Sequence, residues 1–76
     1  MEELVKTIAL SLVESPADVS VREIEKDGET VIELKVAADD MGKVIGKQGR
    51  IAKAIRTVVK AAAAKSGKSI GVEIVQ

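Results

Sequence analysis

The sequence contains no cysteine, no histidine and no aromatic residue. Without cysteine, disulfides and thiolate metal sites are excluded, and without histidine so are the common zinc sites and nucleophile–base pairs. Carboxylates, lysines and hydroxyls remain for chemistry, so we expect no enzymatic activity, no catalytic residue, no metal and no cofactor. Because 46% of the residues are hydrophobic, the core must be built from aliphatic side chains.

A long apolar run is also missing. The residues from Met1 to Lys6 are acidic in balance, and no basic segment precedes an apolar stretch there. The sequence therefore predicts no signal peptide and no membrane span, and we expect a cytoplasmic protein. A length of 76 residues suffices for one small domain, residues 1–76, of the size at which stability is modest.

The 12 basic and 12 acidic residues cancel in number but are unevenly distributed. Residues 1–40 hold eleven acids and four bases, whereas residues 41–76 hold eight bases and one acid. A net charge of zero disfavours a nucleic-acid partner, because domains that bind nucleic acids usually carry excess base. The separation leaves two interpretations: halves that attract each other inside one fold, or a basic surface for an anion.

The first half of the chain predicts a helix followed by a hairpin. Apolar residues recur at helical spacing over residues 2–14, and Pro16 disfavours helix in the residue before it. Residues 19–26 and 30–37 are rich in β-branched side chains. The Asp27-Gly28 pair between them indicates a tight antiparallel turn.

The second half predicts two helices and a strand. Asp39 or Asp40 is expected to cap a short helix through Val44, and a longer helix is expected from about Arg50 to Lys65. The following Ser66-Gly67 pair is expected to end that helix.

A last alternating segment, residues 70–75, predicts a half-buried strand and completes the order α-β-β-α-α-β. A strand, two helices and another strand favour a right-handed crossover. The last strand should therefore lie parallel to the second, with all helices on one face of the sheet. The predicted fold class is α+β in two layers.

The most informative motif is the loop between the two later helices, with Gly46, Lys47, Gln48 and Gly49 followed by Arg50. Glycine lets a phosphate approach the main chain, the start of a helix offers free N–H groups, and the cations add attraction. The pattern predicts a clamp for a nucleic-acid backbone. The competing interpretation is a tight helix-to-helix turn that needs positive φ.

Other phosphate-binding motifs do not match this loop. A nucleotide-binding P-loop requires four residues between its glycines and a Ser or Thr after the lysine, whereas Gly42 and Gly46 are separated by three and Gln48 follows Lys47. The dinucleotide fingerprint fails because Val44 stands where a glycine is needed. Binding of nucleoside triphosphates or dinucleotides is therefore not expected.

The long helix is predicted to have an apolar face and a basic face. Lys53, Arg56 and Lys60 fall on the side opposite an apolar stripe, which predicts solvated surface or ligand contact. The run Ala61 to Ala64 fits a helix and also offers a second subunit a close approach. Without aromatic side chains to stack on bases, nucleic-acid binding is expected to be weak and of low sequence specificity.

The element order, with the glycine loop between two helices, resembles type II KH domains. The stretch from Met41 to Arg56 resembles more narrowly the small single-domain bacterial KH proteins of the KhpA family. The resemblance implies that Gly46, Lys47, Gln48 and Gly49 contact the backbone of single-stranded RNA, with Arg50 beside them. It also implies a base groove at Val44, Ile45, Ile51 and Ile55, which by spacing alone are core residues. Lys43 and Lys53, on the helices flanking the loop, are predicted to make peripheral RNA contacts.

The resemblance also implies partners and a cellular role. Members of this family are expected to self-associate and to pair with a larger KH protein, KhpB, in RNA regulation, cell elongation and envelope homeostasis. Two hypotheses therefore stand: a non-catalytic single-stranded RNA-binding protein, such as an RNA chaperone, or a dimerisation and interaction module with little RNA binding of its own.

Overall fold

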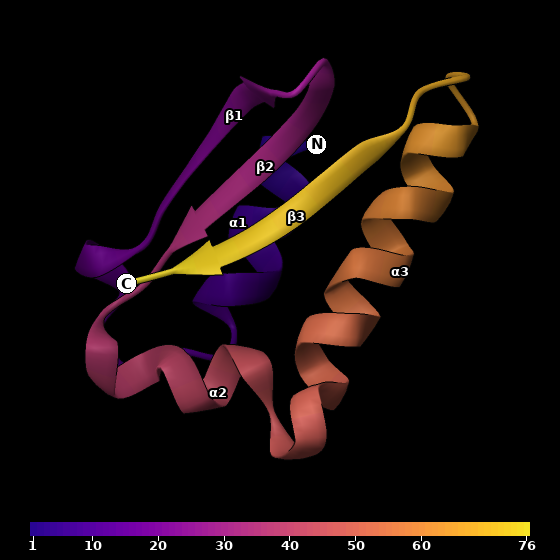
Figure 1. The fold of residues 1–76 in the computed structure, drawn as a ribbon. Helices are drawn as coiled ribbons and strands as arrows, with labels where there is room; N and C mark the ends of the chain where they lie inside the picture. Colours follow the sequence, from indigo (N-terminus) through magenta and orange to yellow (C-terminus); the bar gives the residue numbers. More distant parts are fainter.

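The computed structural model describes all 76 residues (Figure 1). Short 3-10 turns at Pro16–Asp18, Ala38–Asp40 and Lys47–Gly49 lie between the main elements. The main elements are α1 (Glu2–Leu10), β1 (Ser20–Lys26), β2 (Glu29–Lys35), α2 (Met41–Ile45), α3 (Arg50–Ala64) and β3 (Ile70–Val75). The predicted order α-β-β-α-α-β is confirmed.

The three strands form one sheet in the order β1-β2-β3. β1 and β2 are antiparallel, joined by Asp27 and Gly28 at φ 53° and 79°, the left-handed values that a tight hairpin turn needs. β3 lies parallel to β2, so that Ile32 pairs with Val72. Both the hairpin and the parallel crossover are confirmed.

The core lies between the sheet and the helices. Alternate residues of β2 and β3 point their side chains at the helices, and Ile32 and Leu34 are fully buried there. They pack against residues from all three helices, so the helices cover the same face of the sheet. The buried cluster comprises Val5, Ala9, Val19, Ile32, Leu34, Val36, Val44, Ile55, Val59 and Val72.

The other face of the sheet is uncovered by helices. Two ion pairs cross it: Arg22 Nε to Glu33 Oε1 at 2.7 Å and Lys26 Nζ to Glu73 Oε2 at 2.9 Å. They join β1 to β2 and β1 to β3. Of the eight bases in residues 41–76, only Lys43 forms ion pairs with acids of the first half, so the second half keeps most of its positive charge unpaired.

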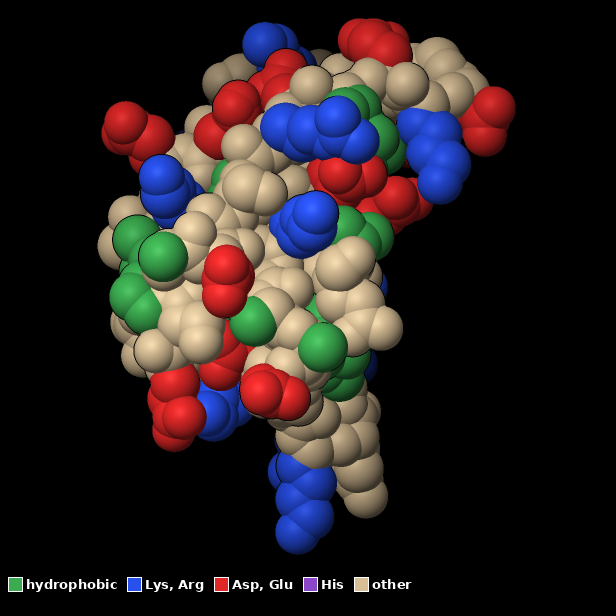
Figure 2. All heavy atoms as spheres, turned by 90° about the vertical axis from the view of Figure 1, so that its left-hand side faces the viewer, with side chains coloured by type: hydrophobic (Ala, Val, Ile, Leu, Met, Phe, Trp, Pro, Cys, Tyr) green, Lys and Arg blue, Asp and Glu red, His purple; other side chains and the backbone are tan.

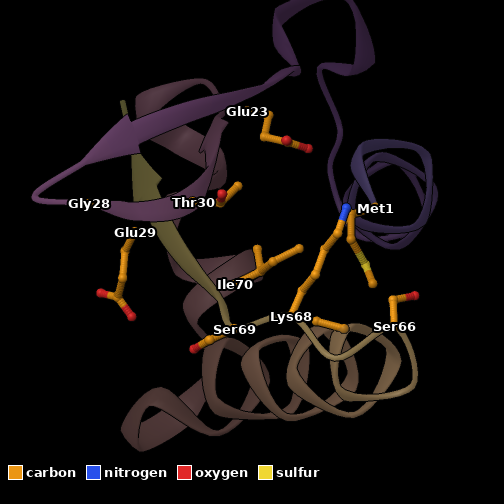
Figure 3. A pocket seen from close by; sticks show the side chains of 10 residues that line it. Met1, Glu23, Gly28, Glu29, Thr30, Ser66, Lys68, Ser69 and Ile70 are labelled. Carbon is orange, nitrogen blue, oxygen red and sulfur yellow. The ribbon is translucent and has the colours of Figure 1, made fainter.

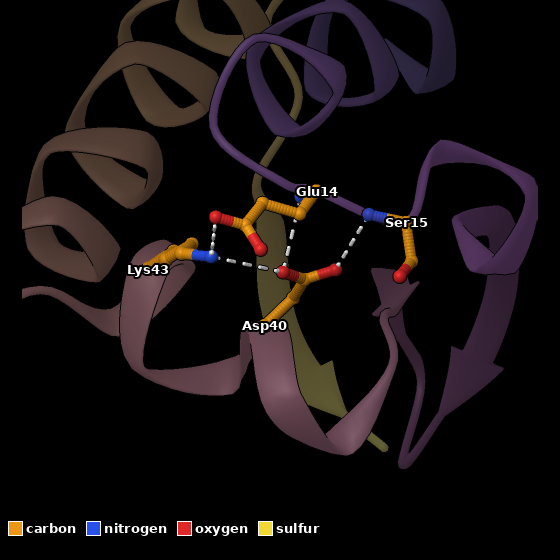
Figure 4. A network of polar contacts seen from close by, with 4 residues as sticks. All are labelled: Glu14, Ser15, Asp40 and Lys43. Atoms are coloured by element: carbon orange, nitrogen blue, oxygen red, sulfur yellow. Dashed lines mark hydrogen bonds and ion pairs between the residues drawn. The ribbon is translucent and has the colours of Figure 1, made fainter.

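Helix α1 ends at Leu10, earlier than the predicted residue 14. The N–H groups of Glu14 and Ser15 do not continue the helix, because each donates to the carboxylate of Asp40, both at 3.1 Å (Figure 4). Ser11 Oγ also donates to the Ile8 carbonyl at 2.6 Å, which satisfies a carbonyl in the last turn. The α-helical pattern already breaks at Leu12, whose N–H donates to the Ala9 carbonyl at 3.0 Å, and the contact with Asp40 fixes the segment that follows α1.

Asp40 also departs from its predicted role. Its side chain makes no capping hydrogen bond to α2, and neither does that of Asp39. Asp40 is instead 1% exposed, and its carboxylate holds the segment that follows α1 against the start of α2. The prediction that Asp39 or Asp40 caps this helix is therefore wrong.

The end of α3 agrees with the sequence. Gly67 has φ 69°, its N–H donates to the Ala64 carbonyl, and the Lys68 N–H donates to the Ala63 carbonyl, both at 3.0 Å. This pair of hydrogen bonds is the Schellman arrangement, which ends helices at a glycine. None of the helices combines the length and the apolar character needed to cross a bilayer.

Candidate nucleic-acid interface

The loop between α2 and α3 forms the lower tip of the molecule in Figure 1. Gly46 has φ 77° and ψ 172°, Gln48 has φ 58° and ψ 27°, and Gly49 has φ 72° and ψ 15°. Three residues with positive φ reverse the chain between the two helices. Both glycines thus have a conformational reason to be glycine, and only Gln48 adopts such a backbone with a side chain.

The two glycines differ in what surrounds them. A Cβ on Gly46 would lie 2.6 Å from Cγ1 of Ile51, whereas a Cβ on Gly49 would meet no atom within 4 Å. Ile51 therefore covers the side of Gly46 that was expected to be open to a phosphate. At Gly49 the main chain is accessible on that side.

Some backbone donors of the loop are used internally. The Gly49 N–H donates to the Gly46 carbonyl at 3.1 Å, and the Arg50 N–H donates to the Lys47 carbonyl. The expected outward row of N–H groups is therefore partly occupied. Binding of an anion would depend mainly on the side chains at the tip.

Those side chains are exposed and lack acidic partners. Lys47, Gln48 and Arg50 are exposed, and neither cation forms an ion pair. The one polar contact among them is from Arg50 Nη2 to Gln48 Oε1 at 3.4 Å. Figure 2 shows a basic side chain projecting from the same lower end, away from the mixed acidic and basic surface above. Positive charge at the tip is thus available to a ligand.

Lys43, predicted as a peripheral RNA contact, lies beside acidic side chains, unlike Lys47 and Arg50 at the tip. Its Nζ lies 3.0 Å from Glu14 Oε1 and 3.6 Å from Asp40 Oδ1 (Figure 4). The hydrogen bond to Glu14 raises the pKa of Lys43, while the hydrogen bond from the Glu14 N–H is the main cause that lowers the pKa of Asp40. The charge of Lys43 is therefore compensated within the protein.

The basic stripe of α3 lies beside the sheet edge. Lys53, Arg56 and Lys60 are exposed, and Arg56 Nε donates to the Val72 carbonyl at 3.3 Å. Because β3 pairs only with β2, its outer edge is open next to this stripe. The sequence alone does not distinguish Arg56 from Lys53 and Lys60, because the contact that distinguishes it depends on where β3 lies.

The four predicted base-groove residues do not share one exposed surface. Val44 is 0% exposed and Ile55 is 2% exposed, because both pack in the core. Ile45 and Ile51 are partly exposed, so a base could touch only these two in this conformation.

Ile51 also faces an apolar groove between α1 and α3. The groove has a volume of about 310 Å³, and one charged residue, Arg50, stands among its lining residues. Val58 is 44% exposed there. The apolar lining consists of Ile8, Leu12, Ile51, Ala54, Ile55 and Val58.

A larger polar hollow of about 610 Å³ lies between the hairpin turn and the end of α3 (Figure 3). Lys68 reaches toward Met1 across it, and Glu23 also lines it. No group of three or more acidic, His or Cys side chains that could hold a metal occurs in the protein. The hollow is remote from the loop and brings together no recognisable set of reacting groups.

Comparison with known proteins agrees with this geometry. Residues 2–74 match the family model described as KhpA/KhpB, KH domain. The RNA-binding protein KhpA of Clostridium perfringens is 63% identical over 75 residues, which are 99% of this chain and 100% of that protein. The RNA-binding protein KhpA of Listeria monocytogenes is 50% identical over 76 residues, the full length of both chains.

A solved structure shows the same fold. The crystal structure of Aquifex aeolicus Era bound to GDP·AlF4⁻ superposes with a TM-score of 0.64 and 24% identity over 97% of this chain, which corresponds to 29% of the Era chain. The sheet order, the helices on one face and the full-length matches lead to one assignment. The chain belongs to the KhpA/KhpB family of KH-domain proteins.

Proposed function

We propose that this protein is a non-catalytic, cytoplasmic single-stranded RNA-binding protein that holds the RNA backbone with its Gly46 to Gly49 loop. The observation that carries the proposal is the tip itself. Lys47 and Arg50 project without acidic partners beside Gly49, whose main chain is open. Family membership and the names of the relatives support RNA as the anion.

The contacts would be mainly electrostatic. Lys47 and Arg50 would neutralise phosphates at the tip, and Lys53 would extend the contact along the first turns of α3. Since no aromatic side chain is available for stacking, most of the affinity would be independent of base sequence. Such binding suits an RNA chaperone or a general regulator.

A double substitution tests the loop. Lys47→Asp with Gln48→Asp reverses the charge at the tip and keeps both glycines, so the turn should fold as before. Lys68→Asp with Ser69→Asp is the matched control, because it makes the same change in charge at the opposite end of α3. Binding of a short single-stranded RNA is measured by fluorescence anisotropy, with thermal unfolding of each variant as the check on folding.

The loop variant and the control variant should differ in RNA binding. We expect the loop variant to lose RNA binding with an unchanged melting temperature, while the control variant binds nearly as well as the parent protein. Equal loss in both variants would mean that net charge alone matters, and unchanged binding by the loop variant would exclude the loop as the clamp.

The apolar groove supports a second candidate function, self-association. A groove lined by Ile8, Ile51 and Val58 is poorly suited to RNA phosphates and well suited to the same groove of a second copy. Of the alanine run predicted to serve this role, Ala63 is 1% exposed and part of the core. The groove is therefore the better candidate surface.

Sedimentation tests this candidate. Val58→Asp places a charge in the centre of the groove, at a position that is 44% exposed, so folding should be retained. We expect the parent protein to sediment as a dimer at high concentration and the variant as a monomer. A parent protein that stays monomeric at every concentration would exclude the homodimer.

Family membership also motivates a cellular proposal. We infer that the chain acts with a larger KH protein of the KhpB type in RNA regulation that affects cell elongation and envelope homeostasis. Pull-down of the tagged chain from its own cells should recover such a protein. If cells lacking the chain keep normal length and envelope resistance, the cellular role is wrong.

A further inference from the structure

We propose that Glu14 limits RNA binding to the α3 side of the tip by neutralising Lys43, the lysine on the α2 side. Glu14 would thereby reduce the number of phosphates that the protein holds and set the direction in which the RNA leaves the loop. The inference rests on the proposed RNA-binding function and adds to it a residue that opposes the affinity of the same site.

Two lysines flank the loop at similar spacing. Lys43 lies three residues before Gly46, and Lys53 lies four residues after Gly49, so each is about one helical turn from the loop. Lys53 forms no ion pair, whereas Lys43 Nζ lies 3.0 Å from Glu14 Oε1. The loop therefore has an uncompensated positive charge on its α3 side and a compensated one on its α2 side.

The position of Glu14 is fixed by its backbone. Its N–H and that of Ser15 each donate to the carboxylate of Asp40 at 3.1 Å, and Asp40 is buried beside the start of α2 (Figure 4). The segment that follows α1 is thereby held against α2, with the Glu14 carboxylate directed at Lys43. Because the side chain of Glu14 is exposed, it contributes charge rather than packing.

The charges around Lys43 sum to a net negative value. Asp40 Oδ1 lies 3.6 Å from Lys43 Nζ, so two carboxylates face one ammonium group. Both oxygens of Asp40 already accept backbone N–H groups, and the shorter contact to Lys43 comes from Glu14. A phosphate that approached Lys43 would meet one unbalanced negative charge, and this repulsion would direct it to the cations of the loop and α3.

Removal of the Glu14 charge should increase RNA affinity. Glu14→Gln keeps the backbone N–H that donates to Asp40, so the segment should stay in place while Lys43 becomes available to a phosphate. One further phosphate contact makes the salt slope for single strands more negative by about 0.7, which corresponds to about fivefold tighter binding at about 100 mM salt. Fluorescence anisotropy with a short single-stranded RNA, repeated at several salt concentrations, measures both quantities.

Two further variants test whether the gain depends on Lys43. Glu25→Gln makes the same change in net charge at an exposed residue without an ion pair, near the hairpin turn and far from the tip (Figure 1). This control should bind within about twofold of the parent protein, because screening weakens distant charges. The double variant Glu14→Gln with Lys43→Met should lose the gain, because the lysine that would hold the additional phosphate is absent. Thermal unfolding confirms that each variant folds.

Amine labelling shows directly which lysines the RNA covers. The parent protein and Glu14→Gln are treated with a limiting amount of an acetylating reagent, with and without RNA, and the modified lysines are identified by mass spectrometry. RNA should protect Lys47 in both proteins and should protect Lys43 only in Glu14→Gln.

The possible outcomes separate this inference from the proposed function. Unchanged binding by Glu14→Gln, an equal gain for Glu25→Gln, or a gain that persists in the double variant would each show that Glu14 does not limit RNA binding, while RNA binding by the parent protein stands. Protection of Lys43 in the parent protein would also overturn the inference, because RNA would then have displaced Glu14. If neither the parent protein nor Glu14→Gln binds RNA, both proposals fall together.

Discussion

The side chain of Ile51 occupies the space that a β-carbon on Gly46 would need, with only 2.6 Å between that carbon and Ile51 Cγ1. Gly46 also has φ 77° and ψ 172°, a backbone conformation found almost exclusively at glycine. The first glycine of the loop is thus required by packing between the end of α2 and the start of α3. The second, Gly49, has only its φ of 72° as a requirement.

Substitutions at these glycines should therefore have unequal costs. Gly46→Ala combines backbone strain with a clash and should lower the free energy of unfolding by about 2–4 kcal/mol. Gly49→Ala has strain alone and should cost about 1–2 kcal/mol. Urea denaturation monitored by far-ultraviolet circular dichroism measures both values.

Gly42→Ala is the control for this pair. Gly42 lies in α2 with no positive φ and no atom within 4 Å of an added Cβ, so alanine should stabilise the protein by about 0.5–1 kcal/mol. Equal losses for Gly46→Ala and Gly49→Ala would contradict the role assigned to Ile51.

Stability should fall at both extremes of pH. The pKa of Asp40 is lowered from 3.8, so its contribution is complete above that pH and is lost as the pH falls toward the lower folded-state pKa. The pKa values of Lys26 and Lys43 are raised from 10.5, so their contributions are complete below that pH and are lost above it. Thermal unfolding between these limits should give a plateau.

Asp40→Asn tests the predicted loss of stability at acidic pH. The variant should be less stable than the parent protein at neutral pH, and the difference should shrink as the pH is lowered through 3.8. Asp39→Asn is the control, because Asp39 is exposed and its side chain accepts no hydrogen bond. A difference for Asp40→Asn that is constant with pH would show that its carboxylate does not titrate with folding.

RNA affinity should depend on salt. If Lys47, Arg50 and one further cation neutralise about three phosphates, a slope near −0.7 per phosphate predicts roughly a twentyfold loss of affinity between about 50 and 200 mM salt. Anisotropy titrations at four salt concentrations give the slope. An affinity that does not change with salt would argue against contact with the backbone.

Two lysines close to the loop should differ in that measurement. Lys47→Met removes an uncompensated charge, so the salt slope should become less negative by about 0.7. Lys43→Met removes a charge that Glu14 and Asp40 already compensate, so the slope should stay as in the parent protein. A larger change for Lys43→Met would mean that RNA displaces Glu14 from this lysine.

Much of the fold could be predicted because its signals are local. Asp27-Gly28 fixes the hairpin through backbone conformation, and Gly67 ends α3 in the same way. The parallel pairing of β2 and β3 follows from the handedness of crossovers, without knowledge of individual contacts. Each of these features depends on neighbouring residues or on a general rule of topology.

The errors arose where distant residues meet. The true role of Asp40 depends on a segment far away in the sequence, because its carboxylate accepts hydrogen bonds from the N–H groups of Glu14 and Ser15. Similarly, the orientation of Arg56 depends on where β3 lies beside α3. Periodicity cannot show such contacts.

The parallel pairing of β2 with β3 also has a kinetic consequence. The loop lies within the chain segment that this pairing closes, so the sheet gains its third strand only after α2, the loop and α3 have been synthesised. Contacts between residues so far apart slow folding, because a long stretch of chain must be ordered first. A nascent chain would therefore acquire a correctly oriented tip only when β3 has emerged and docked, and its binding of RNA would report completed folding.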